Sequence, residues 1–528
     1  MSFAAPRESF ESLMELGLRH LERVVAIDSQ SDERSETLPS TEGQGVIVRD
    51  LQRFFADLGL AGALDPAQNL VVQLPATAGL EARPPLALMV HIDTARGTRA
   101  VPKLDVVPAW DGQPIRFREN DRLVVSAAGY ESTRCFVGED VIHGPGVRAF
   151  GLDDKLGTAE IMTLATVLVS NPTIPHGPLV LVFRPDEEIG RMAAVVGLAE
   201  TLHDLGVRYG YTVDGILPFE VNVSNFNASH GLITVPDDAT RRSFERGLEL
   251  RIEGAKSHGA TAKAEGYLNA TTLLVRALAA LGDDPQVAPL TFETDPLAEV
   301  NATVLFGLDG AEAESRLLAA LAAEVGPHRW RGAGIEVLSH HGAAHGGNAV
   351  ERALELVRWH NENAPFEPVL SETSEGAEGY SNPYGIRTDG ETAIISFRLR
   401  DFHVPTLRAR EAHVRRTAGH FGLPLDAARI AMQYEDMGPS LAPFPELVEW
   451  PRAAAAAMGQ TVTVGPIRGG TGVDPFTARG IPVANVGTGY FAPESEKELT
   501  SRQTLARHAL WLVNLVQAVA ATSAGQHA

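Results

Sequence analysis

The part of the sequence that decides the fold reads Leu86-Ala87-Leu88-Met89-Val90-His91-Ile92-Asp93-Thr94. Its first five residues form a short continuous apolar run, which is typical of a strand buried on both faces of a largely parallel sheet. A histidine and an aspartate follow at the carboxyl end of that strand, where α/β folds place their sites. In isolation a structural histidine is the commoner explanation of such a pair, so the rest of the chain has to decide.

Three more groups of acidic residues occur at comparable points of the chain. They are Asp186-Glu187-Glu188 after the apolar run Leu179–Phe183, Asp214 in Tyr211-Thr212-Val213-Asp214-Gly215, and Asp153-Asp154 before the helical pattern Thr158–Leu168. Each group has an ordinary structural explanation on its own, such as a helix N-cap for the Asp-Asp pair. Together they are hard to explain as unrelated surface loops, and they predict a metal site.

Successive acids at the end of a buried strand are costly unless a cation or solvent offsets their charge. A divalent ion would do so, and one glutamate could bind it while its neighbour acts as a general base. The single cysteine, Cys135, excludes a thiolate cluster, so histidine, aspartate and glutamate must supply the ligands. His91 is the first candidate, and Asp93 is placed to accept a hydrogen bond from its other ring nitrogen.

Length and composition limit the class of protein. A chain of 528 residues, of which 44% are hydrophobic and 21% charged, is long enough for two or three globular domains. Its formal charge of −22 repels phosphate backbones, so we expect no nucleic-acid partner. The sequence shows no export-signal pattern and no apolar run of membrane-spanning length, which, with the lone cysteine, favours a cytoplasmic location and no membrane partner.

Alternating helix and strand patterns indicate an α/β domain in residues 1–221, and the same pattern returns in residues 441–528. Between them, residues 222–440 carry amphipathic strands and helices that predict an inserted α+β domain. Inside it, Ser257-His258-Gly259-Ala260 with Asn269-Ala270 before a helix is echoed by His340-His341-Gly342-Ala343 with Asn348-Ala349 before another. The echo suggests a duplicated unit, and chance similarity of strand–turn–helix order is the equal alternative.

In this order, the motifs H-x-D, G-x-D-D-K-x-G, P-D-E-E-x-G and Y-T-V-D-G resemble those of the di-zinc exopeptidase and aminoacylase family, which includes peptidase T, carboxypeptidase G and acetylornithine deacetylase. The resemblance is nearest to the peptidase T branch and covers almost the whole chain. Further matches are Asn225-Phe226-Asn227-Ala228, Arg400-Asp401-Phe402 and Pro466-Ile467-Arg468-Gly469-Gly470-Thr471. The resemblance implies an α/β fold in which a discontinuous zinc-exopeptidase catalytic domain carries an inserted α+β lid domain.

The resemblance also implies a metal-binding role for each matching residue. His91 and Asp214 would bind one zinc ion, and Glu188 would bind the other. Asp153 would bridge the two ions, and Asp93 would orient His91.

The same resemblance implies the catalytic and substrate-binding residues. Glu187 would be the general base, which later returns a proton to the leaving amine, and His258 of the lid would help to polarise the scissile carbonyl. The substrate-binding residues would be Arg400, Arg468, Gly470 and Thr471.

One position departs from the family. The family closes its second metal site with a histidine in an H-x-x-x-E pattern before the last helix, and we match that run to Ala492-Pro493-Glu494-Ser495-Glu496, which puts alanine at the ligand position. Glu494 is the only obvious local substitute. Three outcomes are open: a site rebuilt with an oxygen ligand, a one-metal enzyme, or a protein without ordinary peptidase activity.

The insert is longer than the single lid of peptidase T, with an extra segment at residues 289–368. Some dipeptidases of the family carry a duplicated lid that imitates the partner subunit of dimeric members. A duplicated lid predicts a monomer, whereas a single lid predicts a homodimer. His340, His341 and His345 would then lie in the second lid copy, with ordinary surface histidines as the alternative.

These expectations combine into a metallo-exopeptidase. It would hydrolyse a terminal amide bond of short peptides, most simply as an aminopeptidase on tri- or dipeptides, with one or two zinc ions, or cobalt or manganese, as cofactor. Glu187 would deprotonate the water that zinc activates. An N-acyl amino acid deacylase shares the same core residues and stays open, as does a binding or regulatory protein that kept the fold and lost turnover.

Overall fold

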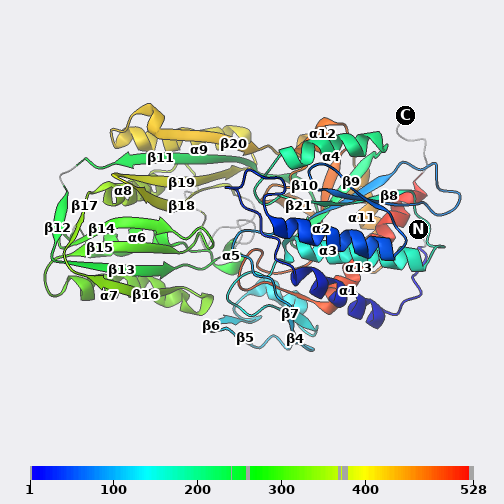
Figure 1. Cartoon of the computed structure of the whole chain (residues 1–528), viewed down its shortest axis with the longest axis horizontal. Helices are drawn as coiled ribbons and strands as arrows, with labels where there is room; N and C mark the ends of the chain where they lie inside the picture. Colours follow the sequence, from blue (N-terminus) through cyan, green and yellow to red (C-terminus); the bar gives the residue numbers. More distant parts are fainter. Residues whose placement is uncertain are drawn as a thin grey trace. The chain divides into compact units, whose positions relative to one another are not determined.

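The computed structural model describes residues 3–238, 241–256, 262–282, 284–366, 370 and 378–522. The chain forms two compact units, each built from separate stretches of sequence (Figure 1). The first unit comprises Met1–Glu119, Val125–Asn225 and Asp436–Ala528, and the second comprises Asn120–Val124 and Phe226–Glu435. The second unit thus covers most of the region that the sequence suggests as an insert and takes in the short stretch Asn120–Val124 as well.

A mixed sheet organises the first unit, with the strand order β1-β2-β8-β3-β9-β22-β10-β21. The strands are β1 Gly62–Leu64, β2 Leu70–Leu74, β3 Leu86–His91, β8 Leu179–Arg184, β9 Tyr209–Gly215, β10 Glu220–Asn225, β21 Thr463–Ile467 and β22 Val483–Gly487. The central strands β8, β3, β9 and β22 run parallel, whereas β1, β2 and β10 join through antiparallel pairs. The expected largely parallel sheet is therefore found at the centre and in the edge pair of β10 and β21, whereas the short turn between β1 and β2 closes an antiparallel pair at the other edge.

Helices bury the sheet of the first unit. They are α1 Phe10–Val25, α2 Glu42–Asp57, α3 Leu152–Ser170, α4 Ala193–Asp204, α10 Gly438–Leu441, α11 Glu446–Ala456, α12 Asp474–Ala478 and α13 Arg502–Ala521. Nearly every residue of α3 is buried, and this helix contacts α1, α13, β3 and β9. The short strands β4 Asp105–Val107, β7 Val141–His143 and β23 Leu499–Ser501 form a smaller sheet. The other short elements are β5 Ile115–Phe117 and η1 Glu131–Phe136 of this unit, and β6 Asn120–Val125, most of which belongs to the second unit.

An antiparallel sheet with the order β16-β13-β15-β14-β18-β19-β11-β20 forms the second unit. Its strands are β11 Asn227–Pro236, β13 Arg246–Glu253, β14 Val287–Thr294, β15 Ala302–Leu308, β16 Gly334–His341, β18 Tyr380–Asp389, β19 Thr392–Asp401 and β20 Ala428–Tyr434. The main helices are α6 Ala270–Leu281, α7 Ala313–Val325, α8 Ala349–Glu362 and α9 Val404–His420. Contacts run from α7 to α6, from α6 to α8 and from α8 to α9, so these helices form one layer. Shorter elements are β12 Arg242–Phe244, α5 Ala262–Glu265, η2 Gly326–Arg331, β17 Ala344–Gly346 and η3 Leu425–Ala427.

The two halves of this sheet repeat one topology. In chain order, one half reads β13, α6, β14, β15, α7, β16, and the other reads β11, α8, β18, β19, α9, β20. In both halves the first strand lies between the third and the fourth, and the second strand lies outside the third. The second strands, β14 and β18, pair with each other and join the halves (Figure 1). The first half is thus inserted into the second, between β11 and α8.

This topology changes the interpretation of the echo around Asn269 and Asn348. These residues precede α6 and α8, which are the equivalent first helices of the two halves. The strands before them are not equivalent, because β16 is the last strand of the first half and the counterpart of β13 is β11. The sequence comparison therefore pairs the correct helices with one wrong strand.

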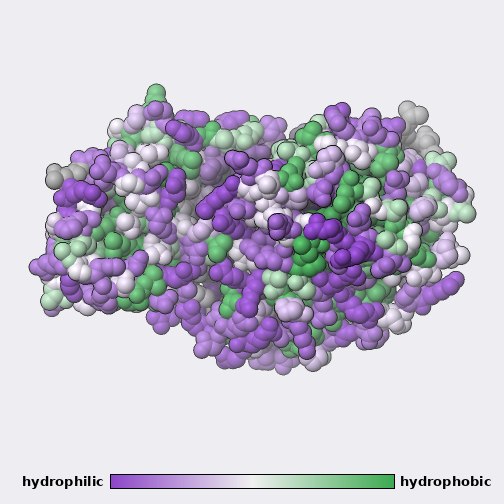
Figure 2. Space-filling model, viewed as in Figure 1, coloured by the Kyte–Doolittle hydropathy of each residue, from purple (hydrophilic) through white to green (hydrophobic). Residues whose placement is uncertain are grey.

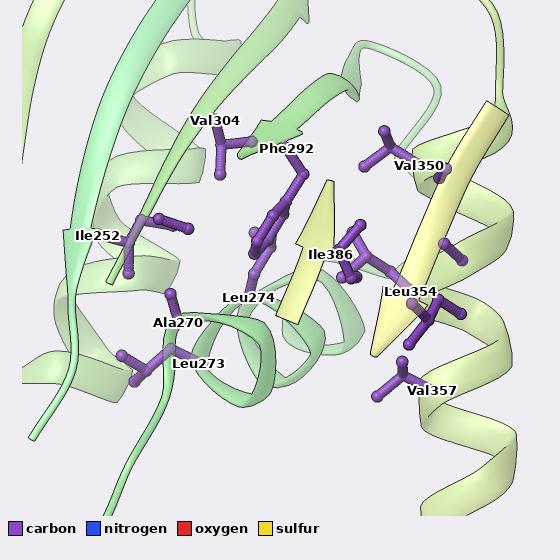
Figure 3. Packing of buried hydrophobic residues seen from close by; sticks show 14 of the residues in the cluster. Ile252, Ala270, Leu273, Leu274, Phe292, Val304, Val350, Leu354, Val357 and Ile386 are labelled. Atoms are coloured by element: carbon purple, nitrogen blue, oxygen red, sulfur yellow. The ribbon is translucent and has the colours of Figure 1, made fainter. Parts of the chain in front are cut away.

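One apolar core fills the second unit across the seam between its halves. Figure 3 shows Phe292 of β14 and Leu274 of α6 on one side, and Ile386 of β18 and Leu354 of α8 on the other. These residues are almost completely buried. The continuous core means that each half shields apolar surface of the other.

The visible surface is mainly hydrophilic, with hydrophobic residues scattered among polar ones (Figure 2). In the part of the chain that the structure describes, no helix combines the length and apolar character needed to cross a bilayer.

Candidate metal centre

The carboxyl ends of three neighbouring strands bring the predicted motifs together. β3 pairs in parallel with β8 and β9, and its last residue, His91, lies opposite Arg184 of β8. Glu187 and Glu188 follow shortly after β8, and Asp214 is the next-to-last residue of β9. Because parallel strands end at the same edge of a sheet, these side chains meet there.

Asp153 and Asp154 reach the same edge from the start of α3. Gly151 precedes the helix with φ +91°, a conformation that glycine adopts without strain. The carboxylate of Asp154 accepts hydrogen bonds from the backbone N–H groups of His91 and Gly157, at 3.2 Å each. These bonds fix the Asp-Asp segment against the end of β3.

Two groups of side chains offer ligand atoms within 4.8 Å of one another: His91, Asp154 and Asp214, and His91, Asp153 and Glu188. Nε2 of His91 lies 3.0 Å from Oδ1 of Asp153 and 3.5 Å from Oδ1 of Asp214. An imidazole nitrogen among carboxylate oxygens is a donor set that zinc accepts and that also suits neighbouring divalent metals.

The electrostatics of these carboxyl groups fit a bound cation. Burial, followed by the charge of Asp214, raises the pKa of Asp154, and burial, followed by the charge of Glu494, raises the pKa of Glu188. Oε1 of Glu188 is buried and has no hydrogen-bond partner among the described residues. A divalent ion would offset the repulsion and satisfy this oxygen, so the residues present fit a metal.

Asp93 ties the histidine to the loop that carries the glutamates. Its Oδ1 lies 3.4 Å from Nδ1 of His91, and its backbone oxygen lies 3.0 Å from the same nitrogen. The carboxylate also accepts the backbone N–H groups of Glu187 and Glu188, at 3.0 and 3.1 Å. Burial alone would raise the pKa of Asp93, but the hydrogen bond and the charge of His91 lower it overall.

Glu187 lies beside a buried arginine. Burial raises the pKa of Glu187 to about 7, against the opposing charges of Arg184 and His91. Nη2 of Arg184 lies 3.4 Å from Oε1 of Glu187, and the same guanidinium donates to the carbonyl oxygens of Thr471 and Gly472. Arg184 therefore holds the loop around residue 471 against the loop that carries Glu187.

The expected substrate-binding residues lie in different surroundings. Arg468 and Thr471 belong to the first unit and are each 3% exposed, and the Thr471 hydroxyl donates to Sδ of Met437 at 3.5 Å. Gly470 is exposed. Arg400 belongs to the second unit, where Nη1 donates to the carbonyl oxygens of Ser229 and Leu399. Their role in substrate binding stays a prediction.

The histidines predicted for the lid divide into two groups. His258 lies outside the described residues. His340 and His341 end β16 with half-exposed side chains near Glu314 and Glu249, and His345 of β17 is hydrogen-bonded to Ser243. These three belong to the surface of the second unit, as the alternative interpretation has it.

The run from Ala492 to Glu498 gives a result that the sequence comparison missed. Ala492 is completely buried with φ +60°, and Glu494 has φ +55°. Oε2 of Glu498 accepts the backbone N–H groups of Phe150, Gly151 and Leu152, and its Oε1 accepts that of Glu494 at 3.0 Å. The H-x-x-x-E spacing fits Glu494 and Glu498 as well as Ala492 and Glu496, and only the first choice places its glutamate, Glu498, against the segment before Asp153.

Sequence reasoning also missed other residues of this region. Asp154 stands within a quoted motif and Arg184 directly before one, so their neighbours were the available signal. Tyr490 had none: its hydroxyl is buried without a hydrogen-bond partner among the described residues, and burial, then the charges of Asp153 and Asp214, raises its pKa. Loop residues of this kind acquire their position from folding alone.

Comparison with known proteins bears on the whole chain. The model of peptidase family M20/M25/M40 matches residues 104–518. Peptidase T of Desulfitobacterium hafniense (strain Y51) is 26% identical over 479 residues, covering 88% of this chain and 89% of that protein. Peptidase T of Lysinibacillus sphaericus (strain C3-41) is 26% identical over 509 residues, covering 95% and 97%.

Solved structures share the fold. A tripeptidase from Staphylococcus aureus aligns with a TM-score of 0.51 at 16% identity, over 96% of this chain and 99% of that one. Aminoacylhistidine dipeptidase from Vibrio alginolyticus aligns with a TM-score of 0.50 at 16% identity, over 97% and 98%. At this identity the likeness concerns the fold alone.

Proposed function

The chain belongs to peptidase family M20/M25/M40, a family of metallopeptidases, and on that premise we propose that it hydrolyses a terminal amide bond of short peptides. The resemblance inferred from the motifs is thereby confirmed at the level of the family. The observation that carries the proposal is the position of Glu187, a partly buried carboxyl group whose pKa is raised to about 7, beside two groups of side chains that could bind a metal.

His91, Asp153, Asp214 and Glu188 would hold one or two ions, with zinc as the first expectation and cobalt or manganese as alternatives. A bound divalent ion would polarise the scissile carbonyl and make water a better nucleophile. Asp93 keeps His91 in one orientation through its contacts with Nδ1, which leaves Nε2 directed at the carboxylates.

Glu187 moves the proton. Its carboxylate accepts a proton from the attacking water, and the resulting carboxyl group returns it to the leaving amine. A pKa of about 7 suits both steps near neutral pH, because neither form is then scarce. Arg184 supports the charged form, and the backbone bonds to Asp93 hold the glutamate in place.

The kind of substrate, and the end from which it is cleaved, are proposed from the relatives. Proteins named peptidase T match almost the whole chain, which favours aminopeptidase action on tri- or dipeptides. Arg400, Arg468, Gly470 and Thr471 remain the proposed substrate-binding residues, and His258 the residue that polarises the carbonyl. The burial of Arg468 and Thr471 means that they would act chiefly by shaping the loop 468–472.

We further propose that the chain acts as a monomer, in the cytoplasm. The repeated halves of the second unit join edge to edge through β14 and β18, as two copies of a single lid would. A sedimentation measurement that finds a stable dimer would count against this part of the proposal.

Glu187→Gln tests the proposal, with a panel of dipeptides, tripeptides and N-acyl amino acids. We expect the natural protein to release amino acids from peptides and the variant to lose about 10²–10⁴-fold in kcat. Metal content and circular dichroism should stay unchanged. Glu131→Gln, at an exposed glutamate, is the matched control and should be fully active.

The same panel separates the other candidates. Turnover of N-acyl amino acids alone would make the protein a deacylase. Metal binding and peptide affinity without turnover, unaltered by Glu187→Gln, would identify a binding protein and overturn the proposal.

A further inference from the structure

The two groups of ligands differ in chemistry. The first group, His91 with Asp154 and Asp214, combines an imidazole with carboxylates. The second group, His91 with Asp153 and Glu188, shares only His91 with the first, and the run that carries the family's closing histidine has alanine at position 492 and glutamate at position 494. Once His91 is engaged in the first position, every side chain left for the second is a carboxylate.

Glu498 anchors Glu494 to this position. One carboxylate binds three backbone N–H groups just before Asp153 and the backbone N–H of Glu494, so the two segments are held by the same side chain. The Glu498 side chain is 1% exposed, and such a bridge between backbone segments leaves little freedom. Glu494 is in neither group of side chains whose ligand atoms lie within 4.8 Å of one another, but its charge is the first neighbouring charge that acts on Glu188.

Ala492 cannot be the ligand that closes the second metal position. It is completely buried, its side chain has no donor atom, and its φ of +60° is a conformation that few residues adopt. The left-handed conformations of Ala492 and Glu494 make the chain turn twice within three residues, and the second turn carries the glutamate. A buried polar group supports the region as a ligand site: Tyr490 is 3% exposed, and its hydroxyl has no partner among the described residues, while the charges of Asp153 and Asp214 act on it more strongly than other charges do.

We propose that Glu494 is the closing ligand of the second metal position. Glu188, Asp153 and Glu494 then make an all-oxygen site that selects zinc over manganese less strongly than the His91 position does and can therefore hold manganese beside zinc. Carboxylate oxygens suit manganese and magnesium, whereas imidazole favours zinc. The His91 position would keep its preference for zinc. The protein would therefore work best with two different ions, and this inference rests on the proposed metal-dependent hydrolysis.

The negative charge of Glu494 also favours binding of manganese at this position. A glutamate in place of a neutral histidine adds a negative charge whose effect reaches Glu188, and this strengthens the attraction for any divalent ion. It does not add the nitrogen that separates zinc from harder ions. The glutamate should therefore raise the affinity of this position for manganese without raising its selectivity for zinc.

Glu494→His tests the inference by metal binding rather than by turnover. Metal-free protein is loaded with one equivalent of Zn²⁺ and then titrated with Mn²⁺, followed by calorimetry and by the electron paramagnetic resonance signal of free Mn²⁺. We expect one further equivalent of Mn²⁺ to bind to the natural protein. In Glu494→His, the ratio of zinc to manganese affinity at this position should rise at least about tenfold, and in Glu494→Gln the Mn²⁺ affinity should fall about 10–100-fold.

Ala492→His is the matched control, because it restores a histidine at the position that the sequence comparison chose. It should leave the metal preference unchanged if it folds, and Glu494→Gln, which is isosteric, keeps the test valid if either histidine variant is unstable. Two equal zinc sites, with the same metal preference in Glu494→His, would overturn the inference. Failure of the natural protein to bind any metal would instead overturn the proposed function.

Discussion

The two units bury different kinds of side chain. At the ends of β3 and β8 and the start of α3, the first unit buries Asp93, Asp154, Lys155 and Arg184, each at most 1% exposed. The main core of the second unit is apolar throughout and extends over both halves of its sheet. The first unit thus gathers buried charges at one edge of its sheet. The second unit also buries charged groups, such as the ion pair of Arg410 and Asp401, but its main apolar cluster spans both halves of its sheet.

The difference means that the stability of the second unit and the metal chemistry of the first depend on different interactions. Burying charges costs free energy unless partners or a metal compensate, so the interior of the first unit depends on its ligands. Apolar burial in the second unit contributes to stability without a cofactor. We therefore expect the first unit to respond to metal and the second to respond to packing.

The largest effect should come from the core of the second unit. Phe292 is completely buried between the two halves, so Phe292→Ala should cost about 3–5 kcal/mol of the free energy of unfolding. Urea denaturation would measure the loss, and hydrogen exchange should place it in β14, β18 and α6. Metal content should not change.

Phe292→Leu is the control for that variant. It keeps most of the apolar volume and should cost less than Phe292→Ala. If either variant lost bound metal together with its loss of stability, the expectation that the two units respond separately would be wrong.

Asp93→Asn tests the first unit, where Asp93 contacts the candidate metal ligand His91. The substitution removes the charge that orients His91, so metal affinity should fall about 10–100-fold, or about 1.4–2.7 kcal/mol. Equilibrium dialysis with Zn²⁺ measures the change, and hydrogen exchange in β14 and β18 should remain as in the natural protein. Asp57→Asn, at an exposed aspartate, is the control and should bind metal normally.

Much of the site could be predicted because it depends on local sequence. An apolar run followed by H-x-D or D-E-E places polar groups at the end of a buried strand, and His91, Glu187 and Glu188 lie there. Asp214 follows the same rule. Parallel pairing of three strands then brings them together without further information.

The rest depends on contacts between distant segments. Choosing Glu494 rather than Ala492 as the ligand position requires knowing that Glu498, and not Glu496, binds the backbone before Asp153. No periodicity in the sequence carries that choice. Two turns with positive φ, at residues that are not glycine, also lie outside ordinary sequence rules.

The second unit shows the same limit at the level of topology. Its helices and most of its strands follow from their apolar patterns. The insertion of one half into the other separates β11 from α8 along the chain, so the repeat is visible in strand order and only partly in sequence. Pairing of strands far apart in sequence is a property of the folded state.

The smallest expected effect concerns acid, and it tests whether the second unit is independent of the metal centre. His360 of α8 is completely buried, and burial, then the charge of His413, lowers its pKa to about 3. Below pH 6.5 the unfolded chain binds a proton that the folded chain does not, so stability falls as the pH falls from 6.5 towards 3. At pH 5.5 the loss is about 1.4 kcal/mol relative to pH 7.5. His360→Gln should lose less stability over this range, measured by urea denaturation, whereas His203→Gln, at an exposed histidine, should behave as the natural protein does. The metal-free protein should show the same difference between the two variants, because acid acts on this histidine through burial in the second unit and not through the ligands of the first; a difference that vanished without metal would mean that the two units do not respond separately.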